Sequence, residues 1–274
     1  MTLHPHDPSQ SERPQLSTGS GEPDSLAGLA GGVGSASGAD AAGGAGAAYK
    51  PSERALADRI VWIDCEMTGL SLEHDALVEV AALVTDYELT VLGDGVDVVI
   101  RPPDAALAQM DPFVRDMHTA SGLLDELADG VPMAQAQQQV LDYVRAWVPE
   151  SRRAPLGGNT VGTDRGFLAR DMPELEAHLH YRVVDVSSIK ELARRWYPRA
   201  YFNAPAKSGG HRALADIRES IAELRYYRAA IFVPPPGPDT PTVRALGERF
   251  AVDHGPDHPA RGNRVESTGA DPVR

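Results

Sequence analysis

The chain reads IVWIDCEMTGL from Ile60 to Leu70, an apolar stretch into which Asp64 and Glu66 are set two residues apart. On a β-strand, residues i and i+2 point to the same face, so both carboxylates converge on one point. Burying a carboxylate without a partner costs several kcal/mol. The pair therefore predicts a metal-binding or catalytic site. The alternative is a chance acid pair on a solvated edge strand, which the apolar flanks disfavour.

The order of sequence patterns after this stretch predicts an α/β fold. Two further runs rich in Val and Leu, at 76–86 and 91–100, are separated by a short turn, so we expect three consecutive antiparallel strands. Apolar residues recur at helical spacing from Pro132 onward. Strand and helix patterns then alternate. The predicted architecture is a mixed sheet, three antiparallel strands followed by alternating helices and strands, flanked by helices.

The later elements are predicted from short segments. APLGGN and YRVVDV are expected to be strands, and TDRGFLARD, SSIKELARRW and HRALADIRESIAELRYYRAAIF are expected to be helices. Ser188 and Glu191 have the spacing of a capping box, so Ser188 is expected to open its helix. The last helix has the clearest pattern, because one apolar stripe contains Leu214, Ile217, Ile221 and Leu224.

Composition divides the chain into one folded domain, 56–232, between two arms. The N-terminal arm, 1–55, is rich in Gly, Ala, Ser and Pro, and the tail, 233–274, is rich in Pro, Gly and charge, so both are expected to be disordered. There is no apolar stretch of membrane-spanning length and no signal-peptide pattern. The only cysteine, Cys65, suits a reducing compartment and is expected to be a packed side chain. These features predict a soluble, cytoplasmic protein.

The formal net charge of −13 argues against a protein that holds long nucleic acid on a basic surface. Binding to long duplexes is therefore not expected. A very short anionic substrate held through metal ions remains compatible with this charge, since acidic clusters are what hard divalent cations prefer.

A third acid, Asp164, follows a glycine-rich turn and begins a helical pattern. It could be a first-turn carboxylate stabilised by the helix dipole. Alternatively, the glycines could let the chain approach a ligand closely. The sequence alone leaves both interpretations open.

His211 and Asp216 lie five residues apart, which on a helix separates two side chains by about 140°. Both therefore cannot share one helical face. We expect His211 on the glycine-flanked segment before the last helix and Asp216 in its first turns. A histidine on such a segment could act as a general base; the alternative is a surface histidine beside a solvated aspartate. Together with Asp64, Glu66 and Asp164, they suggest a two-metal site for phosphoryl displacement.

Several longer strings of the sequence match known motifs. DCEMTGL, TDRGFL and HRALAD resemble the motifs of the DEDDh 3′-to-5′ exonucleases of the ribonuclease H-like superfamily. WIDCEMTGL, MHTASGL, MPELEAHLHYRVVDVSSIKELARRWYP and DIRESIAELRYYR are similar to the oligoribonuclease family. This resemblance covers 58–232.

The resemblance implies roles for individual residues. Two Mg²⁺ or Mn²⁺ ions would be held by Asp64, Glu66, Asp164 and Asp216. His211 would deprotonate the attacking water, and the product would be a 5′-nucleoside monophosphate. Leu70 would pack on a substrate base and Phe113 would stack on the other, in a place where tryptophan is usual. Further substrate contacts are expected from Gly69, His118 and Asn159. In a homodimer, Tyr181 would reach the partner's site, with His180 and Arg182 nearby.

The resemblance thus predicts degradation of very short single-stranded RNA, dinucleotides included. An enzyme that trims longer RNA or DNA 3′ ends is the alternative within the same chemistry. A non-catalytic binder of nucleic acid with the same fold is a third possibility, but it predicts gaps in the acid set, and none of the five positions is missing.

Overall fold

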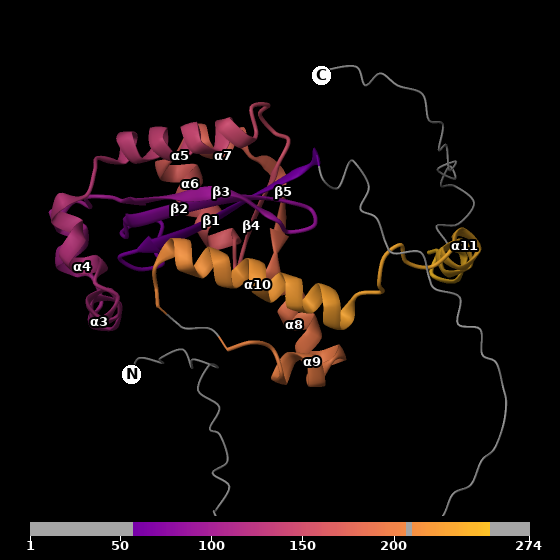
Figure 1. Cartoon of the computed structure of the whole chain (residues 1–274). Helices are drawn as coiled ribbons and strands as arrows, with labels where there is room; N and C mark the ends of the chain where they lie inside the picture. Colours follow the sequence, from indigo (N-terminus) through magenta and orange to yellow (C-terminus); the bar gives the residue numbers. More distant parts are fainter. Residues whose placement is uncertain (1–56, 207–209, 253–274) are drawn as a thin grey trace, which may run out of the picture. The chain divides into compact units, whose positions relative to one another are not determined.

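The structure, a computed structural model, describes residues 57–206 and 210–252 (Figure 1). Its strands form one five-stranded sheet in the order β3-β2-β1-β4-β5. The strands are β1 (Arg59–Met67), β2 (Leu77–Asp86), β3 (Val91–Val99), β4 (Pro155–Gly158) and β5 (His180–Asp185). The first three pair in antiparallel fashion, whereas β4 lies parallel to β1 and β5 parallel to β4. The predicted mixed sheet is confirmed.

Helices cover both faces of this sheet. They are α2 (Asp104–Gln109), α3 (Pro112–Ala120), α4 (Leu123–Glu126), α5 (Met133–Trp147), α6 (Gly162–Asp171), α7 (Pro173–His178), α8 (Val186–Trp196), α9 (Pro198–Phe202), α10 (Ala213–Ile231) and α11 (Thr240–Arg249), with a 3-10 turn η1 (Leu127–Asp129). In Figure 1, α5, α6 and α7 lie on one side of the sheet and α8 and α10 on the other.

Because helices cover both faces of the sheet, its central strands are buried on both sides. Every residue of β2 is buried, which explains why its sequence is a continuous apolar run rather than an alternating one. In β1, Val61 and Ile63 join the core cluster that includes residues of α5, α6 and α7. Ile60 and Trp62 join the cluster that includes residues of α8 and α10. The odd and even positions of β1 thus serve two separate cores.

The last helix of the domain follows its predicted stripe. Ile217, Ile221 and Leu224 of α10 are buried and Leu214 packs beside them against the same core cluster. This packing lays α10 along the face of β1 that carries Ile60 and Trp62. The N-terminal end of α10 holds Asp216 in its first turn, as expected.

One helix start was predicted wrongly. α8 begins at Val186, and its N-cap is Asp185, whose Oδ1 accepts a hydrogen bond from the Ser187 amide at 3.2 Å. Ser188 lies inside the helix and donates its hydroxyl to Asp185 Oδ2 at 2.6 Å. Asp185 is also the last residue of β5, so the strand leads into the helix without a loop and the earlier cap prevails.

The predicted arms lie largely outside the described residues. Within the described part of the C-terminal segment, Asp239 caps helix α11 by accepting from the Thr242 amide at 2.9 Å, and no residue of this helix is buried. In the part of the chain that the structure describes, no helix is both long and apolar enough to cross a membrane.

Candidate functional site

Asp64 and Glu66 lie near the carboxyl end of β1, on the face that α10 covers. They continue the alternation of Ile60 and Trp62, which pack against α10, whereas Cys65 lies in the opposite core. The expected convergence of the two acids follows from this alternation. Glu66 is only 8% exposed, so it is more buried than a carboxylate that opens freely to solvent. Cys65 is a packed, buried thiol, as predicted.

Asp164 reaches the same strand, β1, from α6, which lies on the side of the sheet opposite α10. It lies in the first turn of α6 and is 6% exposed. Its Oδ1 accepts a hydrogen bond from the Cys65 amide at 3.0 Å. Asp164 is therefore a first-turn carboxylate, as one interpretation held, and it also lies beside Asp64 and Glu66.

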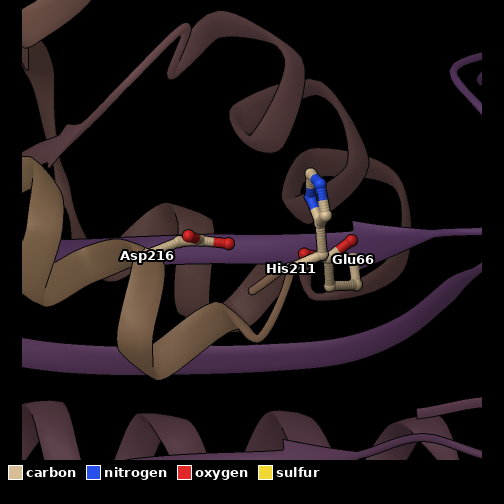
Figure 2. A group of neighbouring side chains, drawn as sticks. All are labelled: Glu66, His211 and Asp216. Atoms are coloured by element: carbon tan, nitrogen blue, oxygen red, sulfur yellow. The ribbon is translucent and has the colours of Figure 1, made fainter. Parts of the chain in front are cut away.

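Helix α10 and the segment before it bring the remaining two residues. One ligand atom from each of Glu66, His211 and Asp216 lies within 4.8 Å of the others. In Figure 2, Asp216 extends from α10 towards Glu66, and the His211 ring stands beside Glu66. The structure thus joins residues that are about 150 positions apart in the sequence.

Burial, together with the charges of neighbouring acids, raises the pKa of the carboxylates at this site. Burial, followed by the charges of Asp164 and Glu66, raises the pKa of Asp64 to about 9. Burial and then the charge of Asp216 raise the pKa of Glu66 to about 8, although Arg212 opposes the shift. The pKa of Asp164 rises to about 6, again mainly through burial, and the hydrogen bonds from backbone amides limit the rise.

These properties fit a divalent cation. Oxygen ligands from several carboxylates are what Mg²⁺ and Mn²⁺ prefer. Without a cation, burial and then the charges of neighbouring acids hold the pKa of Asp64 and Glu66 well above ordinary carboxyl values. A nearby positive charge would reverse these shifts. The donor set therefore suits a cation, and the structure places His211 beside Glu66 and Asp216 rather than at a distance.

Glu79 is a site neighbour that the sequence patterns did not single out. It is fully buried on β2 and is the register partner of Glu66 on β1. Its Oε1 accepts from Arg212 Nε at 2.9 Å, and its Oε2 accepts from the Ala213 amide at 3.0 Å. The signal was a single acid in the apolar run LVEVAALV, the same kind of anomaly that marked Asp64 and Glu66.

The loop after β1 is held in shape by Asp75. Its Oδ1 accepts from the Thr68 hydroxyl at 3.0 Å, and its Oδ2 accepts from the Ser71 amide at 2.9 Å. A Cβ on Gly69 would lie 2.5 Å from Asp75 Oδ2, so a larger residue here would displace the Asp75 carboxylate. Leu70, between these anchors, is 77% exposed. An apolar side chain held in this way is available to contact a ligand.

Helix α3 carries the predicted contacts Phe113 and His118. Phe113 is 75% exposed, whereas His118 is fully buried and lies within hydrogen-bond distance of the Met67 carbonyl through Nε2, at 2.9 Å. His118 Nδ1 is also buried, without a partner in the described part of the chain. His118 thus connects α3 to the end of β1, which leads directly into the loop that carries Leu70. Phe113, on the same helix, is exposed.

Asn159 lies in a polar cluster beneath α10. Its Nδ2 donates to Ser220 Oγ at 2.7 Å and to Glu223 Oε2 at 3.3 Å, and its Oδ1 accepts from Ser187 Oγ at 3.0 Å. These bonds connect the end of β4 to α8 and α10. The side-chain amide of Asn159 is therefore hydrogen-bonded within the protein.

Tyr181 lies near the start of the edge strand β5 and is 73% exposed. Its ring stacks on His180 at 4.4 Å between centroids, and its hydroxyl accepts from Arg182 Nε at 3.2 Å. His180 is level with Pro155 of β4, and the next residue of β4, Leu156, is level with Val61 of β1. Glu66 lies several residues further along β1, at ~3.3 Å per residue. Tyr181 therefore lies towards the opposite end of the sheet from the acids of its own chain.

Comparisons with known proteins show which family the chain resembles. A family model described as RNase T exonuclease matches residues 61–224. The chain is 74% identical to an oligoribonuclease of Streptomyces avermitilis over 195 residues, which cover 71% of this chain and 98% of the relative. It is 66% identical to an oligoribonuclease of Cutibacterium acnes, over 70% of this chain and 95% of the relative.

Solved structures show the same fold at low sequence identity. The zinc-ion-bound form of E. coli exonuclease I in complex with single-stranded DNA has a TM-score of 0.50 and 16% identity, and the match covers 64% of this chain and 41% of that chain. At this identity the likeness concerns the fold alone. It places the five-stranded sheet and its helices among the ribonuclease H-like folds.

Proposed function

The chain belongs to the oligoribonuclease family of exonucleases, and from that membership we propose how its own residues act. It is a 3′-to-5′ exoribonuclease that acts on short RNA. The acidic cluster at the end of β1 agrees with the divalent metal ions that the exonuclease family and fold imply. The observation that carries the mechanism is the convergence of Glu66, His211 and Asp216 within 4.8 Å, beside Asp64 and Asp164.

We assign the metal-binding role to Asp64, Glu66, Asp164 and Asp216, with two ions, Mg²⁺ or Mn²⁺, as the cofactors. Bound cations of this kind activate a water and offset the charge of the phosphate under attack. His211 accepts the proton of that water on its imidazole nitrogen. Its exposed position at the site suits a group that must take up a proton and release it to solvent. Attack of this water on the terminal phosphodiester breaks its P–O3′ bond; a 5′-nucleoside monophosphate leaves, and the O3′ of the shortened RNA takes up a proton to become a hydroxyl.

Two exposed apolar side chains fit the expected contacts with substrate bases. Leu70 and Phe113 are each about three-quarters exposed, and each lies on a segment anchored to the end of β1. Stacking on an aromatic contributes about 1–3 kcal/mol per base and does not depend on sequence. We propose that Leu70 packs on one base and Phe113 on the other, so that dinucleotides are substrates.

We also propose a homodimer in which Tyr181 enters the partner's site. Tyr181 is exposed on an edge strand and lies towards the far end of the sheet from its own acids. It could therefore complete an active site only from a second copy. His180 and Arg182, which contact its ring and hydroxyl, would hold it in place. A cytoplasmic location, proposed here, suits the buried thiol of Cys65 and an RNA substrate.

The test is turnover of end-labelled RNAs from the dinucleotide upward, with Mg²⁺ or Mn²⁺ added in turn to metal-free protein. We expect the highest kcat/KM on the dinucleotide and no turnover without a cation. Faster turnover of a long 3′ overhang than of the dinucleotide would instead support an enzyme that trims longer ends. Full turnover without any divalent cation would overturn the mechanism.

A further inference from the structure

Glu79 is a fully buried carboxylate near the start of β2, and both of its oxygens accept hydrogen bonds. A buried acid is tolerated when it is paired and its remaining oxygen is hydrogen-bonded. Here the pairing partner is Arg212 and the second donor is the amide of Ala213. Both residues directly follow His211 in the sequence, at the start of α10.

The contact with Ala213 compensates for a weak helix start. The N-cap residue of α10 is Arg212, whose side chain gives no capping hydrogen bond. The first amides of a helix have no partner within the helix. Glu79 supplies an acceptor to the first of them from a neighbouring strand, and its negative charge is favourable at a helix N-terminus. The position of α10 at the site therefore depends on β2.

Arg212 extends the connection to a second element. Its Nη1 and Nη2 donate to Glu126 Oε1 and Oε2 at 2.8 and 3.0 Å, a bidentate pair at the end of α4. Its Nε donates to Glu79 at the same time. Bidentate guanidinium–carboxylate pairs fix orientation as well as distance. The guanidinium thus holds the start of α10 between β2 and α4.

The backbone of His211 has an unusual conformation that depends on these neighbouring contacts. His211 has a φ of 46°, in the left-handed region that residues other than glycine seldom adopt. Such a conformation persists where the surrounding structure holds it. The side chain of His211 is exposed, whereas the next two residues along the chain are fixed by Glu79 and Glu126.

We propose that Glu79, Arg212 and Glu126 form an anchor that positions His211 over the metal-binding acids. The three are positioning residues, because they act through the backbone of His211 and α10. The proposal rests on the function proposed above, since it presumes that His211 takes the proton of the attacking water. It predicts that loosening the anchor lowers kcat far more than it changes KM for a dinucleotide.

The primary variants are Glu126→Gln, which breaks the more exposed side of the anchor, and Arg212→Gln, which also removes the charge partner of the buried Glu79, so its folded fraction is measured as well. The matched control is Arg228→Gln, on the same α10. Arg228 Nη2 pairs with Glu88 Oε2 at 2.7 Å, and Arg228 and Arg212 have similar side-chain exposure, 33% and 30%. Small misplacements of a catalytic group cost up to about 100-fold in rate. We expect kcat to fall roughly 10- to 100-fold in the anchor variants and less than about twofold in the control.

A second readout does not use activity. In metal-free protein, amide hydrogen exchange at Ala213 should speed up in Arg212→Gln and in Glu79→Gln, and remain unchanged in Arg228→Gln. If Glu79→Gln or Arg212→Gln does not fold, Glu126→Gln, at the half-exposed end of the Arg212 pair, still decides the outcome. Unchanged exchange at Ala213 together with an unchanged kcat in the variants that fold would overturn the anchor. So would a loss of activity that follows only the fraction of folded protein.

A double-mutant cycle separates this proposal from the general mechanism. Adding Arg212→Gln to His211→Ala should cause little further loss, because the anchor acts through His211. An equal, additive loss in both backgrounds would overturn the anchor and leave the mechanism standing. If His211→Ala alone keeps full turnover, the proposed role of His211 as base fails instead, whatever the exchange data show.

Discussion

The amide of Cys65 donates a hydrogen bond to Asp164 Oδ1 at 3.0 Å. This bond joins β1, which carries Asp64 and Glu66, to α6, which carries Asp164. β4 is in register with β1 only at Val61 and Trp62, so the strands have separated by the level of Cys65. Asp164 accepts the hydrogen bond of the Cys65 amide, which β4 does not reach. The end of a parallel strand pair is where α/β sheets commonly bind ligands, and here one carboxylate both accepts this hydrogen bond and faces the acidic site.

Asp164→Ala and Asp164→Asn should therefore differ in stability and agree in activity. Alanine leaves the buried Cys65 amide without an acceptor, which costs about 1–3 kcal/mol. Asparagine keeps an acceptor oxygen but removes the charge. We expect the free energy of unfolding in denaturant to fall only for alanine, and turnover to be lost in both. Equal stability of the two variants would mean that the bond contributes nothing.

The stability of the metal-free protein should decrease as pH rises. The pKa values of Asp64 and Glu66 are raised in the folded state to about 9 and about 8. A raised folded-state pKa contributes stability below the unfolded value near 4, and that contribution is lost as pH rises through the folded value. Thermal melts between pH 5 and pH 9 should show a falling Tm.

The matched variants for this prediction are Asp64→Asn and Glu66→Gln, which should flatten the decrease. Added Mg²⁺ or Mn²⁺ should raise Tm most at the alkaline end, because there the acids carry most charge. A Tm that rises with pH in metal-free protein would contradict the assigned pKa shifts.

The main features of this site were predictable from local patterns. The positions of Asp64 and Glu66 follow from strand alternation, and Asp216 follows from the start of a well-marked helix. What the sequence could not show is which distant groups meet. The bond from the Cys65 amide to Asp164 depends on where β4 ends, and the role of Glu79 depends on the register between β1 and β2.

Two local predictions illustrate the same limit. The capping pattern at Ser188 competes with Asp185, and only the path of β5 into α8 decides between them. His118 was expected only from the resemblance, and its burial against the Met67 carbonyl depends on how α3 folds back on β1. In both cases the tertiary path of the chain decides the contacts of the residue.

His211→Ala should lower turnover far more than it lowers cation affinity. General-base catalysis contributes about 10²- to 10⁴-fold in rate. We expect kcat on a dinucleotide to fall within that range and the Mn²⁺ affinity, measured by calorimetry, to change little. A parallel collapse of both quantities would show that His211 serves mainly as a ligand, which its position beside Glu66 and Asp216 makes a meaningful alternative.

Gly69→Ala should weaken substrate binding through the loop that presents Leu70. Its added Cβ would meet the Asp75 carboxylate, which holds Thr68 and Ser71. Displacing one such bond costs about 1 kcal/mol, or roughly fivefold in KM for a dinucleotide. Gly247→Ala is the control, since nothing lies within 4 Å of its Cβ. An unchanged KM in Gly69→Ala would argue against a role for this loop in binding.

Mixing two inactive variants should restore activity if Tyr181 acts across a dimer. An Asp64→Ala subunit lacks the metal site but can offer Tyr181, whereas a Tyr181→Ala subunit has the acids and lacks the tyrosine. In a heterodimer, the acids of the second subunit meet the intact tyrosine of the first, so one complete site forms. We expect each variant alone to be strongly impaired and the mixture, after exchange of subunits, to regain turnover. Mixing Asp64→Ala with His211→Ala should restore nothing, because both residues serve the same chain's site. Recovery in that control, or none in the first mixture despite proven exchange, would place Tyr181 outside the partner's site.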